Sequence, residues 1–169
     1  MVTTADAEFA RTIRLLRNQG MEQRYANEIV GANMRLTDVA AAVGREQLKK
    51  LDGWNKQRRA NAEFLSAGLK HVVTPPTEDG CEHVFHQYTI RVSSGRDEVQ
   101  AGLKERGIGS AVYYPTPIHL LKPYRGQQQG ELPETMRAAE EVLSLPVYPG
   151  LDENQLTRIV DAVNELTAG

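Results

Sequence analysis

The sequence predicts an α/β (α+β) fold in which helices precede a small C-terminal domain, a short sheet covered by helices. Two observations lead to this prediction. Apolar residues recur at helical spacing in the segments before residue 70. From residue 71 onward, short segments of alternating apolar and polar residues are followed by segments with helical spacing. We therefore expect residues 1–53 to form helices and a loop, and residues 54–169 to form the small α/β domain.

The first part should open with a helix over residues 4–18. This spacing places Phe9, Ile13 and Leu16 on one helical face, and Thr4 is a suitable N-cap. A native domain rarely begins so close to its first helix, so the opening looks like the middle of a longer protein. We therefore expect the chain to be a fragment.

A long connection and a second helix should complete the first part. Residues 19–36 show little periodicity, and functional residues concentrate in loops of this length. Thr37 should cap the next helix, which carries an apolar stripe over residues 39–48. A break is expected near Asp52 and Gly53, before an amphipathic helix over about residues 54–69.

The second part should continue with strands. Residues 71–74 form a short apolar segment stopped by two prolines, which suits a short strand. Residues 82–92 alternate over a long stretch and should form a second strand. One face of that strand would carry Val84, Tyr88, Ile90 and Val92.

The remaining elements alternate between helix and strand. Residues 96–106 should be helical up to a glycine stop, and residues 109–113 should form a third strand. A helix is expected over residues 133–143, with proline in its first turn. After a short extended piece, Asp152 should cap a last helix over residues 153–166.

Composition excludes several classes of function. The 20 basic and 22 acidic residues give a net charge of -2, which argues against a general nucleic-acid binder. The apolar segments all fall short of the roughly 20 residues that a membrane span requires. The single cysteine and the lack of a signal-like opening indicate a cytoplasmic protein. No nucleic-acid or membrane partner is expected.

The segment GANMRLTD, residues 31–38, is the first candidate site. Arg35 offers a planar fork for a carboxylate or phosphate, and the amide of Asn33 offers a neutral donor. The alternative is that both side chains merely tie the loop to its own backbone.

The segment YYPTPIH, residues 113–119, is the second candidate site. Its two prolines restrict the directions that Tyr114 and His119 can take, and histidine titrates close to neutral pH. The alternative is a strand ended by prolines and followed by an exposed histidine.

A metal site is not expected. His83 and His86 fall on opposite faces of the expected strand and so cannot easily chelate one ion. The sequence around Cys81 offers nothing that would lower the pKa of its thiol.

Several ordered segments form a pattern that covers essentially the whole chain. They are MVTTADAEFARTIRLLRNQG, RYANEIVGANMRLTDVAAAVGREQLKKL, NKQRRANAEFL, HVFHQYTIRV, RDEVQAGLKERGIGSAVYYPTPIHL and LPETMRAAEEVLSLPVYPGL. The GxNxR loop before a helix of small residues, together with YPxPxH, is highly specific in combination. In this pattern the chain resembles the DegT/StrS-type sugar aminotransferases, which are fold-type I pyridoxal-phosphate enzymes.

The resemblance implies a fragment of such an enzyme. In this family the lysine that binds the cofactor covalently lies shortly before the segment that resembles MVTT, and none of the six lysines here has that context. The chain is then expected to be the C-terminal part, with the small domain of a fold-type I enzyme, and to be inactive alone. The complete enzyme would use pyridoxal 5'-phosphate, whereas none is expected to bind this fragment.

The resemblance also implies roles for five residues. In the family the GxNxR loop crosses a homodimer interface, so Asn33 would donate a hydrogen bond to the phosphate of the partner's cofactor. Arg35 would approach the substrate, and Tyr25, Tyr114 and His119 match positions near the substrate. The implied reaction moves an amino group from glutamate or glutamine to a keto sugar linked to a nucleotide.

Two alternatives from other classes remain open. One is a stand-alone assembly domain without catalysis, and the other is a regulatory or sensory relative of the family. If the chain lacks a large domain, the apolar faces of its first two helices should drive self-association through residues 4–50. Phe9, Ile13, Val39 and Val43 would take part.

Overall fold

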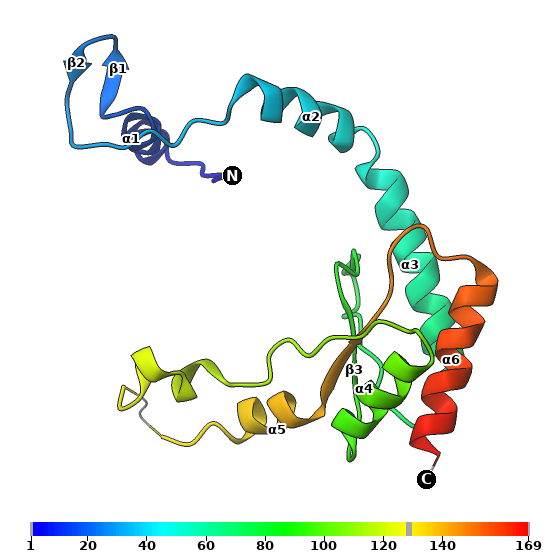
Figure 1. Cartoon of the computed structure of the whole chain (residues 1–169). Helices are drawn as coiled ribbons and strands as arrows, with labels where there is room; N and C mark the ends of the chain where they lie inside the picture. The colour runs from blue at the N-terminus through cyan, green and yellow to red at the C-terminus, as the bar shows by residue number, and fades with distance from the viewer. Residues whose placement is uncertain (1, 128–129, 169) are drawn as a thin grey trace. The chain divides into compact units, whose positions relative to one another are not determined.

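A computed structural model describes residues 2–127 and 130–168 of the chain. The chain divides into two compact units, Met1–Lys50 and Leu51–Gly169, called unit 1 and unit 2 below (Figure 1). The mixed α/β class predicted from the sequence is confirmed, with helices and two small antiparallel sheets in the described part. That the first unit belongs to a larger domain stays a prediction.

Helix α1, Ala7–Arg17, opens unit 1 and begins later than predicted. Its N-cap is Asp6, whose Oδ1 accepts hydrogen bonds from the amides of Glu8 at 2.9 Å and Phe9 at 3.0 Å. Thr4 was the wrong cap, because its hydroxyl oxygen accepts from the amide of Asp6 instead. An aspartate in this position also places negative charge at the positive end of the helix dipole.

The buried face of α1 also differs from the prediction. Leu15 is buried, whereas Phe9 and Leu16 are exposed and Ile13 is half-buried. Leu15 is buried because the chain after the helix folds back over this side, where the amide of Gly20 donates to the carbonyl of Leu15 at 2.8 Å.

The segment predicted as an irregular connection contains a β-hairpin. Strands β1, Met21–Gln23, and β2, Ala26–Asn27, pair antiparallel. The chain then returns along the end of α1, where the amides of Ala32 and Met34 donate to the carbonyls of Leu16 and Arg17. Backbone hydrogen bonds therefore hold the loop that carries the first candidate site.

Two glycines make this return possible. Gly20 has φ of +76°, and a Cβ added there would lie 1.7 Å from the carbonyl oxygen of Ile29. A Cβ on Gly31 would lie 2.3 Å from the backbone nitrogen of Gly20. The two backbone segments approach so closely that neither position has room for a side chain.

Helix α2, Asp38–Leu48, begins where the sequence predicts. The hydroxyl oxygen of Thr37 accepts a hydrogen bond from the amide of Ala40 at 3.2 Å, which confirms Thr37 as the N-cap. The helix has no buried residue, so its apolar stripe is exposed. It ends three residues before α3, Leu51–Gly68, so the predicted break near Asp52 and Gly53 was placed too late.

The central sheet of unit 2 pairs strands β3, Tyr88–Arg91, and β4, Val142–Leu145, antiparallel. Single bridges extend it on both sides, from Val73 to Arg91 and from Ala111 to Ser144. The predicted strands over residues 71–74 and 109–113 therefore contribute one bridge each in place of full strands.

The predicted strand over residues 82–92 is shorter than its alternation suggests. Phe85 has φ of +43°, and its amide donates to Nδ1 of His83 at 2.8 Å, so the backbone turns before β3 begins. Tyr88, Ile90 and Val92 are buried as predicted, but Val84 is exposed. The left-handed conformation at Phe85 ends the alternation at this point.

Strand β4 replaces the end of a predicted helix. Helix α5 runs over Pro133–Glu141, with proline in its first turn as predicted, and the backbone becomes extended at Val142. The prediction of helix up to residue 143 was wrong, because Leu143 pairs with Ile90 and both side chains are fully buried. Tertiary burial overrides the helical spacing here.

Three helices pack on the sheet to form the core of unit 2. Helix α6, Glu153–Thr167, lies beside both α3 and α4, Arg96–Glu105 (Figure 1). Asp152 caps α6 as predicted, in a capping box with Gln155. The first 3-10 helix, Ile118–Leu120, begins within the second candidate segment, and the second, Lys122–Tyr124, follows it. Among the described residues, no helix is both long and apolar enough to cross a bilayer.

Candidate functional site

The first candidate site is centred on two side chains that touch. Nε of Arg35 donates a hydrogen bond to Oδ1 of Asn33 at 3.1 Å. This contact occupies the carbonyl oxygen of the amide and leaves its NH2 group available to donate. Asn33 also pairs with Asn18 through an isolated antiparallel bridge, so the end of α1 fixes its backbone. The arrangement offers one oriented neutral donor beside a guanidinium group.

A cavity of about 460 Å³ lies beside this pair within unit 1. Four arginines line it, together with Leu15, Asn18, Met21 and Glu22. Arg35 is the predicted site residue among them. The other three arginines, Arg11, Arg14 and Arg17, come from α1 and were not singled out in the sequence, although their spacing of three residues in RTIRLLR is visible there.

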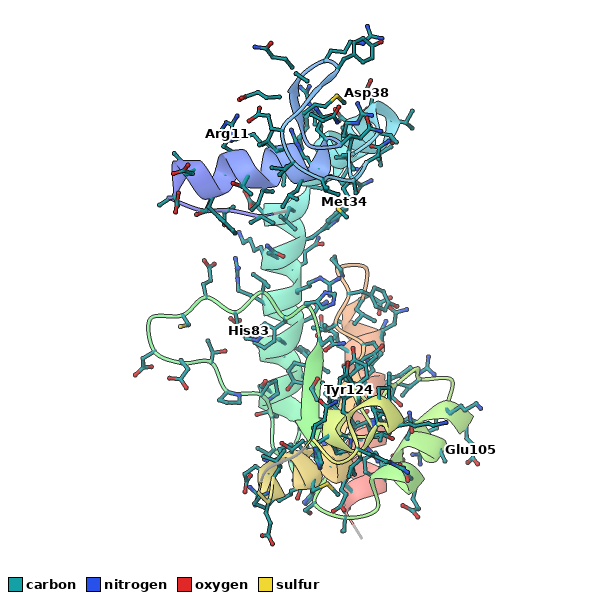
Figure 2. The ribbon with its side chains drawn as sticks, turned by 90° about the vertical axis from the view of Figure 1, so that its left-hand side faces the viewer. Arg11, Met34, Asp38, His83, Glu105 and Tyr124 are labelled. Carbon is teal, nitrogen blue, oxygen red and sulfur yellow. The ribbon has the colours of Figure 1, made fainter. Side chains whose placement is uncertain are left out.

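Arg11 differs from the other arginines because it is already paired. Its Nη2 donates to Glu28 at 2.7 Å and to Glu22 at 2.8 Å. These hydrogen bonds, that to Glu28 first, raise the pKa of the Arg11 guanidinium above its usual value. Figure 2 shows Arg11 projecting from α1. The group is a cation at every physiological pH, and its charge is balanced within the hairpin.

Tyr25 lies at the tip of the hairpin and does not line the cavity. It has φ of +69°, and its ring is exposed with the guanidinium of Arg24 stacked 4.8 Å from the ring centroid. Such a cation–π contact leaves the phenol oxygen free to meet a second molecule. The structure therefore brings Asn33 and Arg35 together but places Tyr25 apart from them.

The second candidate site lies in unit 2. Tyr114 is exposed, with its ring 5.6 Å from that of Tyr113 in an edge-to-face arrangement. His119 is half-buried in the first 3-10 helix. Between them Pro117 is buried.

A second cavity, of about 420 Å³, lies next to the central sheet of unit 2. Its lining includes Arg58, His86, Tyr113, Ser144 and Tyr148, but neither Tyr114 nor His119. The guanidinium of Arg58 donates weakly, at 3.4 Å, to the carbonyls of Phe85 and His86, and so rests on the turn before β3. Sequence reasoning missed Arg58 because its role depends on a helix meeting a turn 27 residues later.

The remaining titratable candidates form no cluster. His83, labelled in Figure 2, lies before β3 and accepts the hydrogen bond from Phe85, whereas His86 lines the cavity. Cys81 is an exposed free thiol. Within residues 2–127 and 130–168, no three His, Cys, Asp or Glu side chains are placed to hold a metal ion.

Comparisons with known proteins agree with this architecture. A model of the DegT/DnrJ/EryC1/StrS aminotransferase family matches residues 1–164. The chain is 43% identical to a dTDP-3-amino-3,4,6-trideoxy-alpha-D-glucose transaminase of Streptomyces venezuelae, over 97% of this chain and 44% of that protein. It is 42% identical to a "pleiotropic regulatory protein" of Geobacillus stearothermophilus, over 98% and 46%.

Solved structures show the same fold. DesV from S. venezuelae superposes with a TM-score of 0.92 at 39% identity, over 99% of this chain and 46% of that chain. A DegT DnrJ EryC1 StrS aminotransferase from Brucella abortus gives 0.91 at 32% identity, over 98% and 45%. The chain thus spans a little less than half the length of these relatives. It belongs to the DegT/DnrJ/EryC1/StrS aminotransferase family.

Proposed function

We propose that the chain is the C-terminal part of a pyridoxal-phosphate-dependent aminotransferase. The complete protein would transfer an amino group from glutamate or glutamine to a keto sugar linked to a nucleotide. The observation that carries this proposal is the family match over residues 1–164, joined to 43% identity with a transaminase named for a dTDP-linked amino sugar. The same 3-amino chemistry appears in the name of a UDP-linked relative from Acidithiobacillus ferrooxidans at 39% identity.

The described residues of unit 1 fit the phosphate of the cofactor. Asn33 is exposed, and its amide group is oriented by Arg35. Its NH2 can therefore donate a hydrogen bond to a phosphate oxygen of the cofactor bound by a neighbouring subunit. Pyridoxal phosphate would supply the electron sink for amino transfer, while this chain contributes binding and orientation. The complete protein would then be a homodimer with its sites at the subunit interface.

The other predicted residues would act on the substrate. Arg35 lines the cavity, and its guanidinium group can bind an anionic part of the substrate. Tyr25, Tyr114 and His119 would contact the sugar or its nucleotide from exposed or half-buried positions. Their contribution is positioning, which lowers the entropic cost of bringing the reactants together.

The covalent anchor of the cofactor is expected outside this chain. All six lysines are exposed, and none lines either cavity described above. We infer that the isolated 169 residues neither retain the cofactor nor turn over substrate. The cytoplasmic location expected from the sequence stays a prediction.

A regulatory function is the second candidate. It is favoured by the names of two relatives, the "pleiotropic regulatory protein" at 42% identity and an "erythromycin biosynthesis sensory transduction protein" from Saccharopolyspora erythraea at 37%. A regulator of this kind would bind the same ligands without releasing an aminated sugar.

The test uses the complete protein of which this chain is a part. It is incubated with glutamate or glutamine and dTDP- or UDP-linked keto sugars, and the aminated nucleotide sugar is detected by mass spectrometry. Formation of this product supports the aminotransferase. Ligand binding without product over many hours would favour the regulator.

Two substitutions separate the roles within the loop. Asn33→Ala should weaken cofactor binding about tenfold to a hundredfold, because it removes a hydrogen bond to a charged group. Arg35→Ala should instead raise KM for the keto sugar. Arg45→Ala, on exposed α2 away from the cavity, is the matched control and should change neither value. If only Arg35→Ala lowers cofactor affinity, the assigned roles are wrong.

A further inference from the structure

A third cavity, of about 240 Å³, lies in unit 2 beside the first two turns of α6. Three segments form it: the turn after α4, the chain between β4 and α6, and α6 itself, which packs beside α4 (Figure 1). It shares Gly109, Pro146 and Tyr148 with the cavity next to the central sheet, and no residue with the arginine-lined cavity of unit 1. None of the residues with a proposed role in amino transfer lines it.

The floor of this cavity is apolar. Ile108 and Ile159 are buried, and Leu151 is half-buried. The side chain of Tyr148 is exposed, but its backbone is fixed, because its carbonyl accepts a hydrogen bond from the buried side chain of Asn61 at 2.9 Å. Side chains of this kind suit a compact apolar group, such as an aromatic ring.

Arg158 brings a positive charge to the same cavity. Its Nη2 donates to the backbone carbonyl of Arg106 at 3.1 Å, which uses one of the five N–H groups of the guanidinium. Arg158 takes part in none of the described ion pairs, whereas the guanidinium of Arg106 pairs with Glu165. The other N–H groups of Arg158 can therefore bind a carboxylate.

Gln155 adds a neutral donor one turn earlier on α6. Its Oε1 accepts a hydrogen bond from the amide of Asp152 at 3.0 Å in the capping box, which leaves its NH2 group without a described acceptor. Residues three apart lie on one face of a helix, and Gln155 and Arg158 both line the cavity. The two side chains can thus donate to the same anion.

A purely structural role explains only the contact between Arg158 and Arg106. That hydrogen bond satisfies a backbone carbonyl just after α4, where the helix no longer does so. It accounts neither for the donor on Gln155 nor for the apolar hollow beside both side chains. The acidic residues further along α6, Asp161 and Glu165, do not line this cavity.

We infer that this cavity binds a small monocarboxylic acid with a compact apolar body. The carboxylate would accept hydrogen bonds from Arg158 and Gln155, while the apolar body would lie against Ile108, Leu151 and Tyr148. A single guanidinium matches one carboxylate better than a dianion. The inference does not rest on the proposed function, because it concerns residues that have no role in amino transfer.

The test is a titration of the isotope-labelled 169-residue chain, followed through its amide chemical shifts by NMR. Phenylacetate carries both the carboxylate and the apolar ring, phenylacetamide lacks the charge, and acetate lacks the ring. The variants are Arg158→Gln, Arg158→Lys and Tyr148→Ala. Lys104→Gln is the matched control, because it removes an exposed positive charge from neighbouring α4 without touching the cavity lining.

Phenylacetate should produce saturable shifts in residues 107–109 and 151–159. It should bind at least tenfold more tightly than phenylacetamide or acetate, because only phenylacetate combines a charge-assisted hydrogen bond with burial of apolar surface. Arg158→Gln should weaken its binding about tenfold or more, and Arg158→Lys should weaken it less. Tyr148→Ala should weaken phenylacetate but not acetate, and Lys104→Gln should leave both affinities unchanged.

Three results would overturn the inference. They are no saturable shift in residues 107–109 and 151–159 at millimolar phenylacetate, equal affinity for phenylacetamide, or equal losses in Arg158→Gln and Lys104→Gln. Circular dichroism of each variant verifies that it is folded. Because no amino transfer is measured, failure of the proposed reaction would leave these affinities unaffected.

Discussion

Unit 1 and unit 2 differ in where their apolar side chains lie. Among the described residues, eighteen buried apolar residues form one cluster, and all of them belong to unit 2. Among residues 2–50, Leu15 is the only buried large apolar side chain, while Val30, Met34, Leu36 and Val39 are exposed. Unit 2 therefore has a hydrophobic core of its own, whereas unit 1 is shaped mainly by backbone hydrogen bonds and close glycine packing.

The largest expected effect comes from removing a core side chain of unit 2. Leu143→Ala should lower the free energy of unfolding by about 2–5 kcal/mol, because Leu143 is fully buried in β4. Leu36→Ala, the same chemical change at an exposed position of unit 1, should stay within about 0.5 kcal/mol. Urea unfolding followed by circular dichroism compares the two. Equal losses would mean that unit 1 shares in the core.

A glycine substitution should affect unit 1 alone. Gly20→Ala places a methyl group against the carbonyl of Ile29 at a positive φ, which should cost about 3 kcal/mol or more of local stability. Hydrogen exchange of the backbone amides should then accelerate in residues 19–34 and stay unchanged in β3 and β4. Gly53→Ala, where a Cβ meets open space, is the matched control. Faster exchange in the sheet would show that the two units are coupled.

A smaller effect concerns Tyr88 in the core of unit 2. Burial raises the pKa of its hydroxyl above the usual value, and the hydrogen bond with Ser66 at 2.8 Å offsets part of this shift. The folded state thus binds the proton more tightly than the unfolded chain, whose tyrosines ionise near pH ~10. Stability should be constant below that pH and should fall as the pH rises above it.

Tyr88→Phe should reduce this loss of stability at alkaline pH. It should also lower the free energy of unfolding by about 1 kcal/mol at neutral pH, because the hydrogen bond with Ser66 is lost. Thermal unfolding between pH 8 and 11 measures both effects. Tyr25→Phe, at an exposed position of unit 1, should leave the stability at neutral pH unchanged. An unchanged alkaline slope in Tyr88→Phe would assign the loss to other groups.

The smallest expected effect on stability comes from changing the exposed apolar stripe of α2, which should instead affect self-association of the chain. The stripe on α2 includes exposed Val39 and Val43, and patches of this kind usually find a partner. Val39→Ser with Val43→Ser should change the unfolding free energy little but reduce self-association of the 169-residue chain. Sedimentation velocity over a concentration series measures this. A chain that stays monomeric at every concentration would contradict the prediction of self-association.

Local signals in the sequence predicted the elements that depend on neighbouring residues. Thr37 and Asp152 act as the expected caps because a cap needs only the first turn of its own helix. These signals failed where the backbone conformation depends on residues far away in the sequence. Val142 and Leu143 continue a helical spacing in the sequence, yet they are extended because β3 offers pairing partners more than 50 residues earlier.

In the candidate site, too, the features set by neighbouring residues were predicted and those set by distant residues were not. The GxNxR loop was visible in the sequence, and the structure brings Asn33 and Arg35 into contact. The arginines of α1 were not identified, because their shared cavity forms only when the loop returns along the helix through Ala32 and Met34. Spacing along one helix gives the direction of its side chains, but not which loop will cover them.

The contact between the first and last helices of unit 2 has a consequence for synthesis on the ribosome. The amide of Lys70 donates to the side chain of Asn164, whose own NH2 donates to the carbonyl of Gly68. Asn164 follows Lys70 by 94 residues, an interval that takes on the order of 5–20 s to translate. During this time Leu65 and Leu69 lack the helix that covers them. The nascent chain is thus exposed to chaperones and to aggregation until its last helix emerges.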